Sequence, residues 1–250
     1  VNANAMKATS PAEETEWGQN ATLYSQRSAK GHRAYVTEQT TYVPNHGEPL
    51  RAGRVGIGAE ISAYPATVNI EAGHGVNLNE KAYAKAGVNY RLSSRLSLNG
   101  NAAYNSANTP TKALNQDVYA NEYNIGANYV YSDNLRMGIG AGVMDFDDGN
   151  VRKTAYAWLS NNLYQHNRWK LSNSLWAGHS NNKDIPEAHY YNPKNSKSLS
   201  GTLALAYSQP FDNRIKLQQT VSAGVGRYWQ AGENAENTWL LKYGHDWQLG

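Results

Sequence analysis

Charged and amide side chains recur at every second position in many short segments of this 250-residue chain. Carboxylates accept hydrogen bonds, guanidinium groups donate them and amides do both, so such rows can bind sugar hydroxyls and acetamido groups. Each side chain could equally pair with a neighbour or face water, but together they predict a hydrated, hydrogen-bonding surface. The candidate contact residues are Glu60, Glu71, Glu122, Asp246, Arg54, Lys85, Arg91, Arg95 and Arg136.

Catalytic chemistry finds little support in the sequence. Cysteine is absent, and the seven histidines form no HExxH motif, nor is a GxSxG motif present. Residues 147–150 lack the spacing and closing glutamate of an EF-hand loop, so they predict a turn in which Gly149 supplies a positive φ. Gly224-Val225-Gly226 lies inside a strand pattern, which argues against a phosphate loop. We expect no enzymatic activity, no metal and no cofactor.

The segments that must position these side chains alternate in polarity. In segment 81–91 the alanines, Val88 and Tyr90 occupy even-numbered positions, which form one parity. The lysines and Asn89 occupy odd-numbered positions, which form the other parity. Segment 95–106 repeats the pattern after Leu92 and the pair Ser93-Ser94. Because strand side chains alternate between faces, each segment predicts a β-strand with one apolar and one polar face.

Many such strands of about ten residues indicate an antiparallel transmembrane β-barrel, apolar outside and polar inside. Inward glycines such as Gly56 and Gly138 relieve crowding on the concave face. The faces of segment 152–164 stay unassigned, and Gln219 lies on an apolar parity without an explanation. About fourteen strands are expected, over 1–8, 17–29, 32–43, 52–63, 66–75, 81–93, 95–106, 118–131, 135–146, 152–164, 169–181, 198–210, 215–229 and 238–250.

The connections between the expected strands alternate in length. Those after even-numbered strands are short, such as 30–31 and 64–65, and those after odd-numbered strands are longer, such as 9–16, 107–117 and 182–197. Outer-membrane barrels place short turns in the periplasm and long loops outside, so the first strand rises and the last descends. A soluble sandwich with Greek-key crossovers has no reason to alternate so regularly.

Composition agrees with a barrel. Mean hydropathy is −0.70, and no apolar run approaches the length of a membrane-spanning helix. Tyrosine and tryptophan, 18 and 7 residues against 2 phenylalanines, suit girdles at the two membrane interfaces. The net charge of +3 is too balanced to indicate a nucleic-acid partner.

Five motifs occur in a fixed order. They are Thr109-Pro110-Thr111-Lys112-Ala113-Leu114, Asp148-Gly149-Asn150 followed by Arg152, Tyr190-Tyr191-Asn192-Pro193-Lys194, Gly226-Arg227-Tyr228-Trp229-Gln230 and Tyr243-Gly244-His245. Together they resemble the C-terminal outer-membrane barrel domain of the poly-β-1,6-N-acetyl-D-glucosamine export porin, most clearly over residues 99–250. Most of the motifs fall in expected outer loops, so the resemblance assigns no lumen residue.

The resemblance implies a sixteen-stranded barrel in the bacterial outer membrane behind a periplasmic tetratricopeptide-repeat domain, which residues 1–250 lack. It also implies export of a partly deacetylated poly-N-acetylglucosamine exopolysaccharide for biofilm formation. Implied partners are the polymer, outer-membrane lipid and periplasmic polysaccharide-processing proteins that would act through the repeat domain. Inward Glu60, Glu71, Glu122 and Asp246 would then offer the polymer's amines weak successive contacts.

The resemblance also favours a barrel truncated at both ends, in which the first and last visible strands expose unpaired edges. A general or oligosaccharide-specific diffusion porin is the main alternative, and it would need a constriction loop, for which 182–197 is long enough. An outer-membrane hydrolase and a soluble carbohydrate-binding sandwich are further alternatives.

Overall fold

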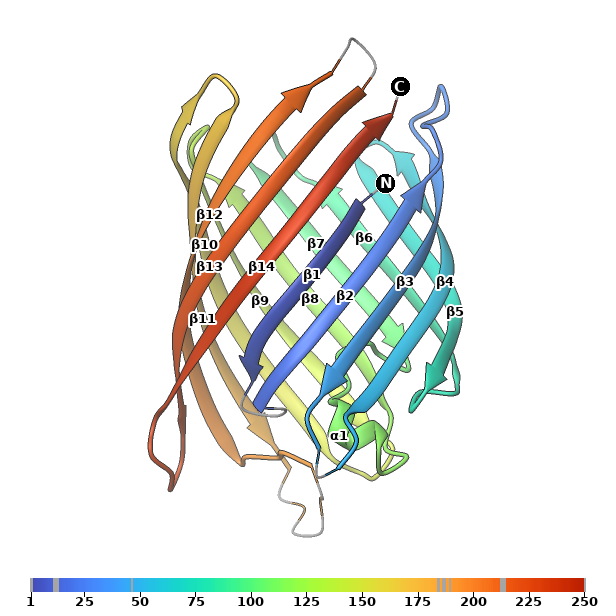
Figure 1. The fold of residues 1–250 in the computed structure, drawn as a ribbon, viewed down its shortest axis with the longest axis vertical. Helices are drawn as coiled ribbons and strands as arrows, with labels where there is room; N and C mark the ends of the chain where they lie inside the picture. The colour runs from blue at the N-terminus through green and yellow to red at the C-terminus, as the bar shows by residue number, and fades with distance from the viewer. Residues whose placement is uncertain are drawn as a thin grey trace.

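The computed structural model describes residues 2–10, 14–45, 47–183, 185, 188, 190–211 and 215–249, in which fourteen antiparallel strands close into a barrel (Figure 1). This confirms the predicted all-β barrel. Among the described residues, no helix is long and apolar enough to cross a membrane. The strands are β1 (Asn2–Ser10), β2 (Glu14–Tyr24), β3 (Arg33–Val43), β4 (Leu50–Ala63), β5 (Ala66–Asn77), β6 (Ala82–Arg91), β7 (Leu96–Tyr104), β8 (Ala120–Val130), β9 (Leu135–Phe146), β10 (Val151–His166), β11 (Trp169–Asn182), β12 (Asn195–Pro210), β13 (Ile215–Gln230) and β14 (Glu236–Leu249).

The first and last strands form the seam that closes the sheet. β1 pairs with β14 from Asn2↔Asp246 to Ala8↔Leu240, and both chain ends lie at the same end of the barrel (Figure 1). The expectation of open edges on these two strands is therefore wrong, because each supplies the other's backbone hydrogen-bond partners. Closure of this chain does not need the two further strands that the resemblance implied.

Large apolar side chains face away from the lumen, as the parity predicted. Ile57, Ile125 and Val225 are 68%, 69% and 73% exposed on the outer surface. The faces of β10, which the sequence left open, follow from its register with β9. Tyr156 lies opposite Gly140 and Trp158 opposite Gly138, and their rings occupy the space that a Cβ atom would take there. These two aromatic side chains therefore point inward.

The connections alternate in length along most of the barrel, with two corrections near the start. Residues 11–13, not 9–16, join β1 to β2, and residues 25–32, not 30–31, join β2 to β3. Side chains replace the strand ladder in this second connection. Ser25 Oγ accepts from Ala34 N at 2.9 Å, and Arg27 Nη1 donates to Gly31 O at 2.9 Å. Of the expected strands and connections, residues 1, 11–13, 46, 184, 186–187, 189, 212–214 and 250 lie outside the described residues.

The connection 105–119 between β7 and β8 folds against the inner face at the long-loop end. It contains a short helix that the sequence did not predict, α1 (Thr111–Leu114), because four residues carry no helical periodicity. An apolar cluster joins this connection, β8 and β9 to Tyr190 of the connection 183–194. Its buried members are Ala113, Ala120, Met144, Phe146 and Tyr190.

Aromatic side chains gather on the outer face at the short-turn end of β11–β14. Trp169 packs against Tyr207 with ring centroids 4.6 Å apart, and Phe211 stacks on Trp247 at 5.7 Å. Tyr243 Oη donates to Gln219 Oε1 at 3.1 Å, which explains the polar residue on an apolar parity. This arrangement fits an interfacial girdle, where apolar rings carry polar tips toward the head groups.

Candidate functional site

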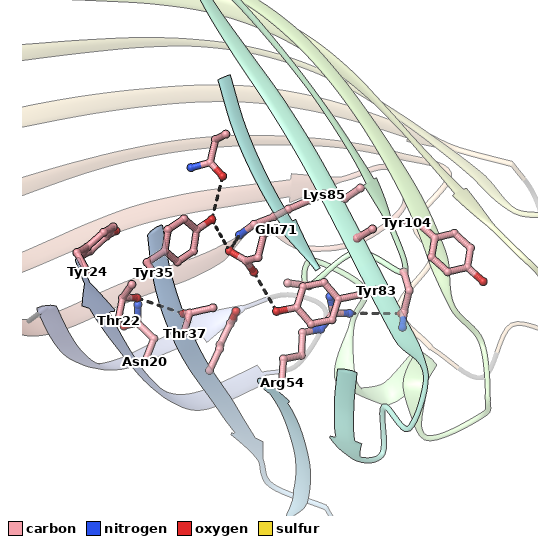
Figure 2. A pocket seen from close by; sticks show the side chains of 16 residues that line it. Asn20, Thr22, Tyr24, Tyr35, Thr37, Arg54, Glu71, Tyr83, Lys85 and Tyr104 are labelled. Carbon is pink, nitrogen blue, oxygen red and sulfur yellow. Dashed lines mark hydrogen bonds and ion pairs between the residues drawn. The ribbon is translucent and has the colours of Figure 1, made fainter. Parts of the chain in front are cut away.

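Glu71 is the centre of a cross-linked network on the inner wall of β3–β6 (Figure 2). Tyr35 Oη donates to its Oε2 at 2.8 Å, and Tyr83 Oη donates to its Oε1 at 2.9 Å. Lys85 Nζ lies 2.9 Å from Oε2. The carboxylate is therefore saturated by two hydroxyl donors and one cation, and Glu71 is only 8% exposed.

The register explains why these groups meet. Glu71 lies opposite Gly58 of β4 and opposite Lys85 of β6. Gly58 has no side chain, so the Tyr35 ring from β3 can extend across β4 and reach the carboxylate. A Cβ atom at Gly58 would collide with that ring. Glycine on one strand thus makes room for a tyrosine from the next.

Arg54 links this wall to the inward-folded connection 105–119. Its guanidinium carbon lies 4.9 Å from the centroid of the Tyr83 ring, within cation–π range. Its Nη2 donates to Ser106 O at 2.7 Å. The side chain is buried, so the cation is held between an aromatic face and a backbone carbonyl rather than in open water.

Two further predicted carboxylates also have partners within the chain. Glu60 forms an ion pair with Arg33 and lies 3.5 Å from Arg27 Nη2. Glu122 accepts from Asn108 Nδ2 and from Asn124 Nδ2, each at 2.8 Å. A separate hydrogen bond from Ser106 Oγ also reaches Glu122. The structure therefore brings Glu71, Lys85 and Arg54 into one network, which Ser106 extends to Glu122, and places Glu60 in another.

The remaining predicted residues lie apart from these networks. Arg91 ends β6, Arg95 lies in the following turn, and Arg136 is the second residue of β9, so all three are at the short-turn end. Asp246 lies near the seam opposite Asn2 and makes no hydrogen bond or ion pair within the described part of the chain.

A hollow of about 260 Å³ opens onto the lumen beside the Glu71 network. The exposed side chains of Asn20 and Gln39 and the half-buried Asn69 supply amides, and the half-buried ring of Tyr24 supplies aromatic surface beside Tyr35, which is itself only 7% exposed. The two ring centroids are 5.4 Å apart. Amide donors and acceptors beside flat apolar surface form a combination that suits a sugar ring.

The opposite half of the inner wall is built differently. On β11–β13 the inward parity, fixed by Trp158↔Trp176↔Ser200↔Gly226, carries mostly small side chains. These small residues are Ser172, Ser174, Gly178, Ser196, Ser198, Ser200, Thr202, Ala204, Ala206, Thr220, Ser222, Gly224 and Gly226. Small side chains leave open space in the lumen next to β11–β13. Next to β3–β6, tyrosines and charged side chains fill the corresponding space.

At the long-loop end a polar network ties the connections 147–150 and 183–194 together. Asn150 Nδ2 donates to Asn192 Oδ1 at 2.8 Å, and Tyr190 Oη donates to Asp148 Oδ2 at 2.7 Å. Burial and this hydrogen bond to Asp148 raise the pKa of Tyr190, so its hydroxyl stays a donor. Arg152 Nη2 donates to Tyr191 O at 3.3 Å. The connections therefore support one another over part of the mouth.

Sequence reasoning missed Tyr35 as a member of the site and did not single out Tyr83. The available signal was the inward glycine opposite a polar residue on the neighbouring strand, as at Gly58 and Glu71. It also missed the inward course of residues 105–119, because contacts such as Arg54 to Ser106 join segments far apart in the chain.

Residues 1–250 match the family described as PgaA membrane beta barrel domain. The chain belongs to this family. Membership in the PgaA barrel family, together with the closed barrel, places it in the bacterial outer membrane as a porin-type barrel.

One solved structure supports the fold, and two others show weaker similarity. A structure titled "Bacterial polysaccharide outer membrane secretin" has 14% sequence identity to this PgaA-family barrel and a TM-score of 0.74, covering 99% of this chain and 97% of that chain. The KdgM porin has 9% identity and a TM-score of 0.43, covering 98% and 99%. OmpT, an outer-membrane protein of Vibrio cholerae, has 8% identity and a TM-score of 0.46, covering 99% and 96%. No curated protein matches the chain.

Proposed function

We propose that the barrel is a non-enzymatic exit channel for partly deacetylated poly-β-1,6-N-acetylglucosamine. The observation that carries the proposal is the hollow beside Glu71, where Asn20, Gln39 and Asn69 present amides next to Tyr24 and Tyr35. N-acetylglucosamine units carry hydroxyl and acetamido groups, which need donors and acceptors together. The apolar face of a sugar ring can lie against an aromatic ring.

The charged residues would act mainly through the wall that they stabilise. Glu60, Glu71 and Glu122 already have partners in the chain, so direct contact with polymer amines would compete with those interactions. Asp246 forms no ion pair or side-chain hydrogen bond among the described residues and only feels the charge of Arg33, so it is the carboxylate that could meet an amine with the least competition. Amides would therefore supply most of the contacts, each weak enough to allow movement along the channel.

A diffusion porin for oligosaccharides is the second candidate. Its supporting observation is the connection 105–119, which folds inward and is anchored to β4 through Arg54 and Ser106. Such a segment would narrow the lumen as a constriction loop does. In either case, we propose that periplasmic polysaccharide-processing proteins would meet the short-turn end.

The test is ionic current through the reconstituted barrel in a planar bilayer. Partly deacetylated β-1,6-linked glucosamine oligomers are expected to interrupt the current, and maltooligosaccharides of equal length are not. Asn20→Ala, in the hollow, should shorten the interruptions. Gln19→Ala, the neighbouring outward position on β2, is the matched control and should leave them unchanged.

Equal interruption by both oligosaccharides would favour the diffusion porin. Current without interruption by any glucosamine oligomer would contradict the export channel.

A further inference from the structure

The outer face of the barrel carries a row of basic side chains at the long-loop end of β10–β13. The row consists of Lys153, His179, Lys197 and Arg227, all exposed and all on the outward parity that they share with Leu199. The register places His179 directly opposite Lys197. Lys153 is diagonal to His179, and Arg227 is diagonal to Lys197, so the four form a continuous line across neighbouring strands.

This row has no anionic partner in the part of the chain that the structure describes. None of its four side chains makes an ion pair or a side-chain hydrogen bond there, and Arg227 only lies 5.9 Å from the Trp229 ring centroid. The outward positions of β10–β14 that the structure describes contain no carboxylate. Like charges on neighbouring strands repel, and the nearest outward carboxylate, Asp145 of β9, is diagonal to Lys153 only, so His179, Lys197 and Arg227 lack an anion that would stabilise them.

The row lies at the level of a membrane interface. Each of its members is within four residues of the long-loop end of its strand, and the apolar outward positions Leu199 and Val225 begin next to it. Trp229 and Trp239 flank it and are 39% and 38% exposed. Tryptophan at this level marks the boundary between hydrocarbon and head groups, and lysine and arginine extend their charges toward it.

Basic side chains continue on the outward face of β1. Lys7 Nζ lies 4.4 Å from the Trp17 ring centroid and 5.6 Å from that of Trp239. Two carboxylates point outward elsewhere: Glu38 on β3, and Asp145 on β9, which lies diagonal to Lys153 at the edge of the row. The cationic surface therefore extends toward β1 and meets a carboxylate at its β9 edge.

We propose that this row is a docking surface for the phosphorylated head groups of lipopolysaccharide in the leaflet around the long-loop end. Long loops of outer-membrane barrels face the outside, where this lipid lies. Clusters of lysine and arginine at an interface attract anionic lipid head groups. Several phosphates on one lipid match a line of cations across neighbouring strands better than a single small anion does.

The test uses the full chain in phosphatidylcholine vesicles with increasing fractions of diphosphorylated lipid A, the phosphorylated part of lipopolysaccharide. Lipid A should raise the Tm of the barrel, and 0.5 M salt should weaken the effect. In Lys197→Gln/Arg227→Gln the half-saturating fraction of lipid A should rise by on the order of tenfold. The control Lys170→Gln/Lys242→Gln removes two inward charges and should keep the original value.

Each contrary outcome overturns the proposal. Equal half-saturating fractions in the two double variants would mean that the row does not hold the lipid. Equal stabilisation by dephosphorylated lipid A would show that the phosphate groups do not contribute to binding. Full stabilisation by inorganic phosphate alone would show an anion site without a preference for lipid. If Lys197→Gln/Arg227→Gln does not fold, Lys197→Gln alone is compared with Lys170→Gln.

Discussion

The inner walls of β3–β6 and of β11–β13 differ in what their side chains do. On β3–β6, Tyr35, Tyr83 and Lys85 converge on Glu71 and hold one another in place. On β11–β13, serine, threonine, alanine and glycine occupy most inward positions and make few side-chain contacts. The difference shows that the polar chemistry of the channel and its open space come from different strands. A polymer would pass between a fixed, chemically varied wall and a smooth one.

The first test of this difference removes Glu71, the centre of the network on the inner wall of β3–β6. Glu71→Ala deletes a charged acceptor for two tyrosine hydroxyls, which leaves Tyr83 without its partner and Tyr35 with Asn69 alone. We expect a loss of about 3–5 kcal/mol in the free energy of unfolding, measured by urea titration in lipid vesicles. Ser200→Ala on the smooth wall should change it by less than about 0.5 kcal/mol. Similar losses would show that the two walls do not differ in stability.

The second test compares the lipid side and the lumen side of one strand. Val88 faces outward on β6 and Asn89 faces the lumen. Val88→Lys should cost about 2–4 kcal/mol near the middle of the bilayer, because it places a charge in hydrocarbon. Asn89→Lys keeps its charge in water and should cost little. Equal losses of unfolding free energy would contradict the assignment of faces.

A third test fills the smooth wall. Ser222 points inward on β13 between Ala204 and Lys242, and its neighbour Val221 points outward. Ser222→Trp should lower single-channel conductance, because the ring takes up space in the lumen, and Val221→Trp should leave it unchanged. The smooth wall would not border the open part of the channel if both variants conducted like the original barrel.

The smallest expected effect concerns the mouth. Tyr190→Phe removes the hydrogen bond to Asp148 and the one accepted from Asn150 Nδ2, and should cost about 1–2 kcal/mol. Since the fold raises the pKa of Tyr190, its contribution to stability is complete below about pH 10 and is lost as pH rises through the raised pKa. Stability measured from pH 8 to 12 should therefore fall less steeply in Tyr190→Phe. An unchanged slope would mean that Tyr190 titrates alike in both states.

Much of the fold could be predicted from the sequence, because strand parity is a local property. The alternation around Val88 places each side chain inside or outside without knowledge of the partner strand. The Glu71 network could not be predicted in the same way, since Tyr35 reaches it across Gly58 from two strands away. The course of residues 105–119 depends on Arg54 and Ser106, which no periodic pattern relates. Connection 25–32 was misjudged because side-chain hydrogen bonds replace the ladder there.

The seam between β1 and β14 has a consequence for the speed of folding. Most strands pair with their neighbours in sequence, so their hairpins can form soon after the segments meet. The pairs from Asn2↔Asp246 to Ala8↔Leu240 instead join opposite ends of the chain, and the entropy of closing that loop is lost before any of them forms. Closure of this seam should therefore be the last and slowest step, after the hairpins have assembled into a curved open sheet.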